Sequence, residues 1–151
     1  MDITTEVESL KQIPIFAKVD PARLKLLAFM SERHTFKVND WLIHEGEIGT
    51  CAYILIEGNV DVLVNVPDGQ IKVAELTKNA IVGEIGIMSD LPRIASVRAS
   101  TPVDTLCISK DVFLSLVTEF PEVALEIINV LAKRLDQLNK RLMKSSSASS
   151  K

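Results

Sequence analysis

Hydrophobic and polar positions change their spacing three times along the chain, and the first pattern, over residues 1–33, is helical. Asp20-Pro21 supplies a helix N-cap followed by proline at the first helical position. Leu24, Leu27 and Ala28 then recur at steps that place them on one face of a helix. This segment is therefore predicted to form N-terminal helices with one apolar side.

Residues 34–109 follow a period of two instead. Apolar and polar residues alternate in short runs, and glycines interrupt the runs at strand-like intervals. The alternating positions include Ile54, Ile56, Val60, Val62, Val64 and Val66, and further runs follow at 71–73, 95–98 and 105–108. Many short strands of this kind are typical of a sandwich or a barrel, so we expect an all-β block.

Helical spacing returns over residues 110–144, where Ser109 is suited to cap the first helix and Phe120-Pro121 separates it from a second. Apolar residues then recur at steps of four and three, the heptad spacing of a coiled coil: Ala124, Ile128, Leu131, Leu135, Leu138 and Leu142. This stripe predicts either packing on the chain's own β block or self-association, and the pattern leaves both open. Residues 145–151 are serine-rich and are predicted to be a disordered tail.

Composition fits one domain and disfavours several classes of protein. The 151 residues are 47% hydrophobic and 25% charged, as in ordinary globular chains. The longest apolar run, residues 51–56, is far shorter than the roughly 20 residues of a membrane-spanning helix, and the acidic N-terminus does not resemble a signal peptide. We therefore expect a cytoplasmic protein with no membrane partner.

Charge argues against nucleic acid as a partner. The net charge is −3, so the basic field that drives nucleic-acid binding is missing. Positive charge gathers only near the C-terminus, where we interpret it as a solvated helix face: Lys133, Arg134, Lys140, Arg141 and Lys144. A regulator that reads DNA is a further alternative, but no second helical domain follows residue 144 in this sequence.

The sequence shows no catalytic constellation. Cys51 and Cys107 lie in apolar stretches outside any C-x-x-C pair and are interpreted as buried free thiols. A cupin-type metal enzyme requires clustered histidines and a carboxylate, whereas His34 and His44 are the only histidines and form no H-x-H motif. Neither a G-x-S-x-G elbow nor a Walker loop is present. We expect no enzyme activity, no metal site and no cofactor.

The stretch 82–97 carries the candidate chemistry. A strand ends at Gly83, a single helical turn is expected over 84–88, and a turn at Pro92 returns Arg93 to the same place. Unpaired N–H groups at the start of a short helix suit a phosphate, and the arginine fork can bind two phosphate oxygens. The arrangement therefore predicts an anion site.

Two further residues refine this prediction. Gly86 would let a ligand oxygen approach the backbone closely. Glu84 would repel a phosphate, and its presence is explained if it accepts a hydrogen bond from an adjacent sugar hydroxyl, which together with the phosphate indicates a nucleotide. On spacing alone the alternative is a surface ion pair between Glu84 and Arg93, worth about 0–1 kcal/mol.

The same stretch strongly resembles the phosphate-binding cassette of cyclic nucleotide-binding domains, the family of the cAMP receptor protein and of protein kinase A regulatory subunits. In that cassette, Gly-Glu is followed about nine residues later by Arg-x-Ala-Ser/Thr-Val. Gly83-Glu84 and Arg93-Ile94-Ala95-Ser96-Val97 match it in place, and residues 45–60 resemble the family's second conserved block. The resemblance covers about residues 13–143.

The resemblance implies an eight-stranded antiparallel β-roll, a jelly-roll, flanked by N-terminal helices and a long C-terminal helix, in one domain over residues 1–144. It implies that Arg93 binds the cyclic phosphate, that Glu84 accepts from the ribose 2′-hydroxyl, and that the N–H groups of Gly86 and Ile94 complete the phosphate site. Isoleucine rather than threonine at position 94 favours cAMP, with cGMP as the second ligand. The candidate ligand-binding residues are Gly83, Glu84, Ile85, Gly86, Arg93, Ile94 and Ala95.

Four residues depart from the family's pattern. Val82 replaces a usual phenylalanine, Gly86 a usual alanine and Asn79 a common glycine, while Thr50 stands where an acidic residue commonly orients the arginine. A hydroxyl is a weaker partner than a carboxylate. Arg93 and Glu84 both remain, but the departures at Thr50 and Val82 leave open an alternative function, a degenerate domain of the same fold that serves dimerisation or docking without nucleotide.

The last helix is the expected moving part. The resemblance implies that helix 121–142 closes over the bound base, which would convert binding into a signal to an effector of unknown identity. The same helix is also the candidate seam of a homodimer.

Overall fold

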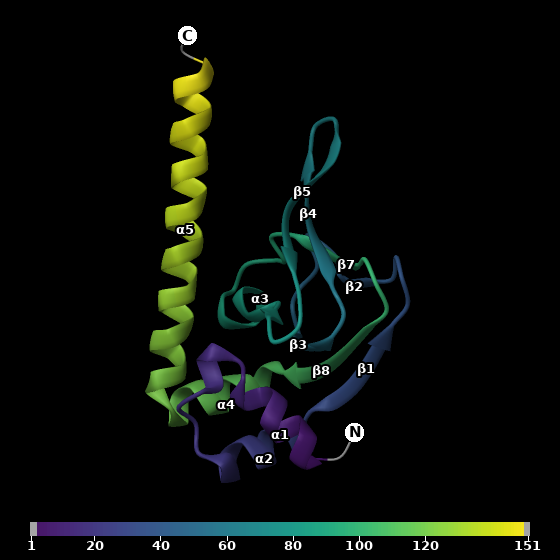
Figure 1. Cartoon of the computed structure of the whole chain (residues 1–151), viewed down its shortest axis with the longest axis vertical. Coiled ribbons are helices and arrows are strands. Elements are labelled where there is room, and N and C mark those ends of the chain that lie inside the picture. The colour runs from purple at the N-terminus through teal and green to yellow at the C-terminus, as the bar shows by residue number, and fades with distance from the viewer. Residues whose placement is uncertain (1–2, 150–151) are drawn as a thin grey trace.

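Two four-stranded antiparallel sheets form a β-roll, as expected from the sequence (Figure 1). The computed structural model describes residues 3–149. One sheet has the strand order β1-β8-β3-β6, and the other has the order β2-β7-β4-β5. The strands are β1 Glu32–Phe36, β2 Trp41–Ile43, β3 Cys51–Glu57, β4 Val60–Val66, β5 Gly69–Leu76, β6 Ile81–Val82, β7 Ser96–Ala99 and β8 Val103–Ser109.

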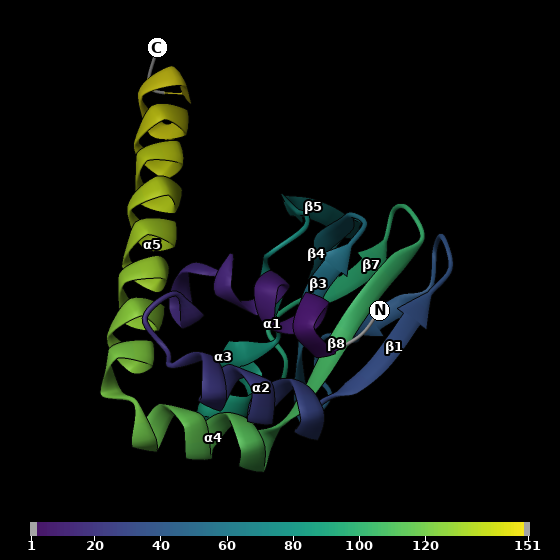
Figure 2. The same ribbon diagram turned by 60° about the horizontal axis from the view of Figure 1, so that its bottom comes forward.

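Helices flank the roll and gather below it in Figure 2, while one short helix lies within the β block. Their bounds are α1 Ile3–Lys11, the 3-10 helix η1 Pro14–Phe16, α2 Pro21–Met30, α3 Glu84–Met88, α4 Lys110–Glu119 and α5 Pro121–Ser149. Both predicted caps are confirmed: the Asp20 side chain accepts from the N–H of Ala22, and the Ser109 hydroxyl accepts from that of Val112. Among residues 3–149, none of these helices is both long and apolar enough to cross a membrane.

Two predicted boundaries are wrong. The β block begins at Glu32 rather than at residue 34. Helix α5 continues through residues 145–149, where the sequence predicts a disordered tail; residues 150 and 151 lie outside the described part of the chain. Extending an existing helix adds one backbone hydrogen bond for each residue that is fixed, which favours the continuation of α5 once the helix has formed.

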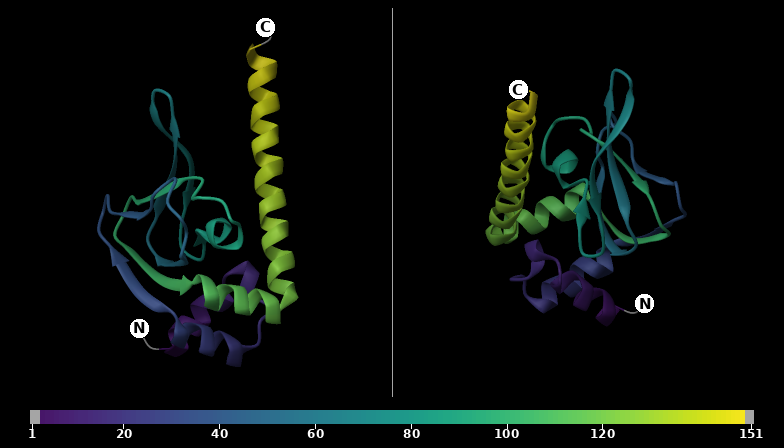
Figure 3. Two further views of the ribbon diagram at one scale, coloured as in Figure 1. Left: turned by 180° about the vertical axis from the view of Figure 1, so that it is seen from behind. Right: turned by 45° about the horizontal axis from the view of Figure 1, so that its top comes forward.

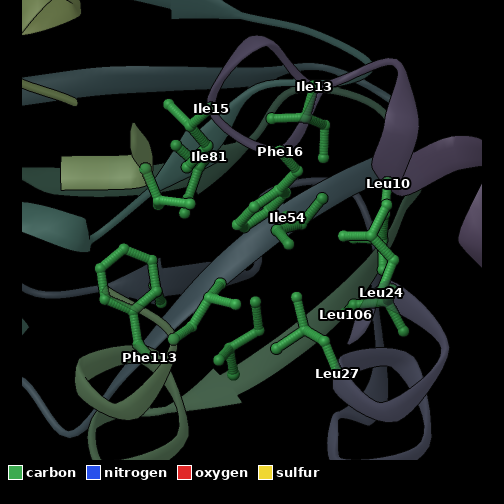
Figure 4. Close-up of a cluster of buried hydrophobic side chains, with 14 of the residues drawn as sticks. Leu10, Ile13, Ile15, Phe16, Leu24, Leu27, Ile54, Ile81, Leu106 and Phe113 are labelled. Atoms are coloured by element: carbon green, nitrogen blue, oxygen red, sulfur yellow. The ribbon is translucent and has the colours of Figure 1, made fainter. Parts of the chain in front are cut away.

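Two apolar clusters stabilise this arrangement. The first lies between the helices and one face of the β1-β8-β3-β6 sheet, where Phe16, Ile54 and Phe113 converge (Figure 4). The second lies between the two sheets and includes Leu55, Val82 and Val97 from β3, β6 and β7. Burying a side chain of this size contributes about 1.5–3 kcal/mol. The sheets and helices therefore hold the segment between β6 and β7 from several sides.

The C-terminal helix packs mainly through residues that adjoin the predicted stripe. Val123 and Ile127 of α5 are buried in the first cluster, with Val130 half-buried against it. The predicted stripe lies one residue further round: Leu131 also packs half-buried against the first cluster, Ala124 is half-buried and Ile128 is exposed. Residues Leu135, Leu138 and Leu142 are 67%, 52% and 60% exposed. In Figures 1 and 3 the outer half of α5 stands apart from the β-roll, and its leucines are exposed, so this part of the stripe does not pack on the chain's own β block.

Cysteines are free, as predicted, but they are half-buried rather than buried. Cys51 and Tyr53 share the face of β3 opposite to the fully buried Ala52 and Ile54, and Cys107 pairs with Tyr53 across the sheet. Burial raises the pKa of the Cys107 thiol to about 12. A thiol with so high a pKa is a poor nucleophile at neutral pH.

Candidate functional site

A pocket of about 140 Å³ opens between α3, the strands around it and α5. It brings together every predicted ligand-binding residue except Arg93: Gly83, Glu84, Ile85, Gly86, Ile94 and Ala95. Helix α3 begins at Glu84, as predicted, and its N-cap Gly83 has a φ of 89°. Such a backbone conformation strongly favours glycine, so the local sequence dictates the turn that starts the site.

Arg93 lies beside this pocket with its guanidinium turned inward. Nη1 donates to the carbonyl oxygen of Gly83 at 2.8 Å, and Nη2 donates to that of Cys51 at 2.7 Å. Arg93 as a whole is only 8% exposed. The sequence predicts that its donors face a ligand, but in this structure one N–H of Nη1 and one of Nη2 are bonded to main-chain carbonyls.

Three glycines form a cradle around that side chain. A Cβ atom on Gly49 would lie 2.9 Å from Cζ of Arg93, and a Cβ on Gly83 or Gly86 would lie 2.7 or 2.8 Å from Nη1. Any of these distances is too short for a non-bonded contact. The close approach that the sequence predicts for a ligand oxygen at Gly86 is therefore made by Arg93 itself.

The backbone of Arg93 is clamped by a turn far away in the sequence. Its N–H donates to the carbonyl of Glu47, and its carbonyl accepts from the N–H of Gly46, both at 2.8 Å. The Ser96 hydroxyl accepts from the N–H of Glu45, also at 2.8 Å. Residues 45–60, singled out for their resemblance to a family block, thus begin with the turn that holds the cassette in place. The sequence shows both segments but not this contact.

Glu84 does not pair with Arg93, so the surface ion pair considered for these two residues is wrong. The Glu84 carboxylate is buried, at 4% exposure of the residue, and its Oε1 accepts from Nη1 of Arg134 on α5 at 3.1 Å. Burial raises the pKa of Glu84, and the positive charge of Arg134 opposes this rise. Within the described residues, no carboxylate lies at ion-pair distance from Arg93.

Arg134 is the residue that sequence reasoning misses. Its charge suggests a place on the solvated face of the last helix, yet it lines the pocket. The signal is present in hindsight, because Val123, Ile127, Val130 and Arg134 follow one another at steps of four, three and four. These steps place the arginine on the packed face of α5, one turn beyond its last apolar contact.

The departures from the family's pattern find different explanations. Asn79 has a φ of 74°, which accounts for glycine being common there and is tolerated by asparagine. Val82 is buried in the second cluster. Thr50 is exposed, and the carbonyl of the next residue, Cys51, holds the arginine. A main-chain carbonyl therefore takes part in the orienting role expected of an acidic side chain.

The two histidines lie on different sheets. His34 on β1 contacts Glu32 at 3.0 Å, and His44 follows β2 and packs near Trp41. Among the described residues, no group of three potential metal ligands gathers at one place.

Comparison with known proteins points in one direction. Residues 33–120 match the family model described as the cyclic nucleotide-binding domain. A CRP-like cAMP-activated global transcriptional regulator of Mycobacterium tuberculosis is 29% identical over 136 residues, which cover 89% of this chain and 61% of the relative. The chain thus spans about three fifths of that protein's length.

Two solved structures share the fold. The regulatory subunit of a cAMP-independent protein kinase A from Trypanosoma brucei is similar with a TM-score of 0.76 and 28% identity, covering 95% of this chain and 51% of that one. The Thermus thermophilus catabolite activator protein has a TM-score of 0.78 at 23% identity, covering 88% of this chain and 63% of that one. The second likeness concerns the fold alone.

Proposed function

This chain belongs to the cyclic nucleotide-binding domain family, and on that premise we propose that it is a regulatory module that binds a cyclic nucleotide, cAMP in preference to cGMP, in the pocket beside α3. One observation carries the proposal: Arg93 is a buried cation with no carboxylate at ion-pair distance among the described residues. Burying an unpaired charge is costly. A cyclic phosphate supplies the missing negative charge, and the ribose brings a hydroxyl to Glu84.

In this proposal the side chain of Arg93 moves on binding while its backbone stays in place. Its backbone is held by Gly46 and Glu47, while its guanidinium contacts two neutral carbonyls. A phosphate adds a negative charge and can accept two parallel N–H bonds from the guanidinium, whereas the carbonyls are neutral and accept one bond each. The guanidinium therefore exchanges its carbonyl partners for the phosphate when a ligand enters.

Preference for cAMP is supported by the residue after the arginine. Ile94 lines the pocket and presents an exposed apolar side chain. Isoleucine offers no hydroxyl to the extra polar groups of guanine, and a polar group placed against it without a partner loses hydrogen bonds to water. Adenine loses less in the same position.

Helix α5 is the element through which occupancy is transmitted in this proposal. It reaches the pocket through Arg134, and its outer half carries the exposed residues Leu135, Leu138 and Leu142 at heptad spacing. Two copies pairing through this stripe would bury what a single copy leaves in water, so we propose a homodimer, with an effector protein as the other occupant. A ligand shifts such a helix only through different affinities for its two positions. The cytoplasmic location and the absence of enzyme activity stay predictions.

A second candidate function is favoured by the small volume that the site leaves for a ligand. The guanidinium of Arg93 occupies the glycine cradle, and the pocket of about 140 Å³ is smaller than the roughly 300–1,000 Å³ of ordinary ligand sites. One protein of similar structure is the regulatory subunit of a cAMP-independent kinase. In this alternative the domain keeps its fold for dimerisation or docking and binds no nucleotide.

Titration calorimetry and thermal unfolding with cAMP, cGMP and linear 5′-AMP separate the two candidates. At a ligand concentration of 100 times the dissociation constant, cAMP is expected to stabilise the fold by about 2.7 kcal/mol, or roughly 5–10 °C in melting temperature for a chain of this size. The Arg93→Leu variant is the control. The absence of both binding heat and a thermal shift with millimolar cAMP and cGMP would overturn the proposed function and favour the second candidate. Tighter binding of cGMP than of cAMP would overturn only the preference for cAMP.

A further inference from the structure

We propose that Arg134 is a positioning residue of the nucleotide site: it keeps the carboxylate of Glu84 ionised and held against the pocket wall, ready to accept a sugar hydroxyl. The observation is the contact of 3.1 Å between Nη1 of Arg134 and Oε1 of Glu84, made by two residues whose positions differ by 50 in the sequence. This inference rests on the proposed function and concerns the same pocket.

Glu84 depends on Arg134 for its charge. Its carboxylate lies in a buried environment, which favours the neutral acid and raises its pKa. The groups that oppose this rise are Arg134 from α5, the backbone N–H of Glu84 itself, and more weakly Arg93 from the segment before β7. Arg134 is the largest of these opposing contributions. Without it, a buried carboxylate would face only a more distant cation.

Ionisation matters because the two forms of the carboxyl group offer different hydrogen bonds. An ionised carboxylate has two oxygens with about four acceptor positions, whereas the protonated acid spends one oxygen on an O–H donor. Arg134 uses one position on Oε1. The remaining positions are free to accept from a ribose hydroxyl while the ion pair persists, so Arg134 and the ligand share Glu84 rather than compete for it.

Helix α5 places Arg134 beside Glu84 with only a partial loss of hydration of the arginine. Val123 and Ile127 anchor the helix in the first apolar cluster, and Arg134 stands on the same face. The Arg134 side chain remains 42% exposed although it meets a carboxylate that is almost completely buried. A cation that keeps part of its hydration has a smaller desolvation penalty than a fully buried one. The ion pair therefore destabilises the fold less than a fully buried pair would, and it still holds the carboxylate in place.

The first test measures cAMP affinity between pH 5 and pH 8 in the wild type, Arg134→Gln and Arg134→Lys. In Arg134→Gln the free carboxyl titrates at higher pH, so affinity starts to fall at a higher pH than in the wild type and levels off near the affinity of Glu84→Gln. The lysine variant keeps the charge and restores most of the affinity. Arg141→Gln is the matched control, because it removes the same charge about two turns further along α5, where the side chain is exposed.

The second test is a double-mutant cycle with Glu84→Gln. If Arg134 acts through Glu84, Arg134→Gln changes affinity less than about twofold in the Glu84→Gln background, and the pH dependence disappears. An equal loss in both backgrounds would show that Arg134 acts on the ligand directly, and the inference would fall. So would a pH profile of Arg134→Gln that matches the wild type.

A ligand-free measurement separates this inference from the proposed function. Carbon-13 NMR of the glutamate side chains follows the titration of Glu84 without any nucleotide. We expect the titration midpoint to be higher in Arg134→Gln than in the wild type and in Arg141→Gln. If the wild type binds no cyclic nucleotide, the proposed function fails while this shift still confirms the pairing; an unshifted midpoint overturns the inference even if cAMP binds.

Discussion

Replacing Gly86 with alanine is expected to tighten cAMP binding by pushing Arg93 out of its cradle. The added Cβ would lie 2.8 Å from Nη1, 3.0 Å from Cδ and 3.4 Å from Cζ of Arg93. All three atoms belong to one flexible side chain, so the arginine moves and the backbone does not. Gly86 lies inside α3, where alanine is favoured over glycine by roughly 0.5–1 kcal/mol.

The size of the effect follows from the two hydrogen bonds that the displaced guanidinium gives up. Gly83 and Cys51 each accept one bond from it. Bonds to charged groups contribute about 1.5–3 kcal/mol, and we take about 1.5 kcal/mol for the pair because the freed guanidinium regains water. A ligand no longer has to break these bonds, so cAMP should bind about tenfold more tightly. Without ligand, Gly86→Ala loses the same 1.5 kcal/mol or so of stability but regains the 0.5–1 kcal/mol by which alanine favours the helix. The net loss is about 0.5–1 kcal/mol.

Titration calorimetry and thermal unfolding of Gly86→Ala and Gly49→Ala test this reasoning together. A Cβ on Gly49 would also approach Arg93, but it would lie 3.0 Å from the carbonyl oxygen of Gly86, which cannot rotate away. We expect Gly49→Ala to lose about 1–3 kcal/mol of stability without a gain in affinity. Weaker binding by Gly86→Ala would show that a ligand oxygen needs the space at position 86, and an affinity unchanged within twofold would refute the displacement of Arg93.

Further outcomes are expected for variants of Arg93, of Glu84 and of the C-terminal helix. Arg93→Leu should weaken cAMP binding by about 2–5 kcal/mol, or roughly 30-fold to several thousand-fold, and a loss within threefold would contradict the assignment of the site. Glu84→Gln should cost less affinity, because an amide oxygen still accepts from a hydroxyl. The folded-state pKa of Glu84 is raised, so its ionisation destabilises the fold as pH rises through that value. Glu84→Gln should therefore unfold at a higher temperature than the wild type at pH 8, and the difference should shrink toward pH 4. A difference that grows toward pH 4 would contradict the raised pKa. Truncation after Lys133 should weaken both cAMP binding and self-association in sedimentation, whereas truncation after Arg134 should weaken self-association alone.

Periodicity along the chain is sufficient to predict most of the elements. The period of two predicts β3, β4, β7 and β8, and the helical steps predict α2, α4 and the inner part of α5. The caps at Asp20 and Ser109 form within one turn of their helices. The turn from Gly83 into α3 is equally local, because the φ of 89° favours glycine and the next residues form the helix. These caps and turns depend only on residues that are close in the sequence, so they can be predicted from the sequence alone.

The faces on which long elements pack are less predictable. On α5 two apolar series run side by side, and only the one containing Val123 and Ile127 is buried. Both satisfy helical spacing, and the direction in which the helix approaches η1 and α4 decides between them. In β4 the register shifts between Val62 and Leu63, and Leu63 is buried while Val64 is half-buried. A one-residue shift exchanges the two faces of a strand.

The contacts of the candidate site come from the tertiary structure. Sequence alone singles out Glu84 and Arg93 as candidate site residues, but it does not predict the protein groups that each of them contacts. Arg93 donates to the carbonyl of Cys51, whose position differs by 42, and Glu84 meets Arg134, whose position differs by 50. Every residue carries the same main-chain carbonyl, so no residue type marks one as a partner. An arginine on a helix likewise has the same letter whether its face meets water or a buried carboxylate, and only the packing of α5 against the roll decides which.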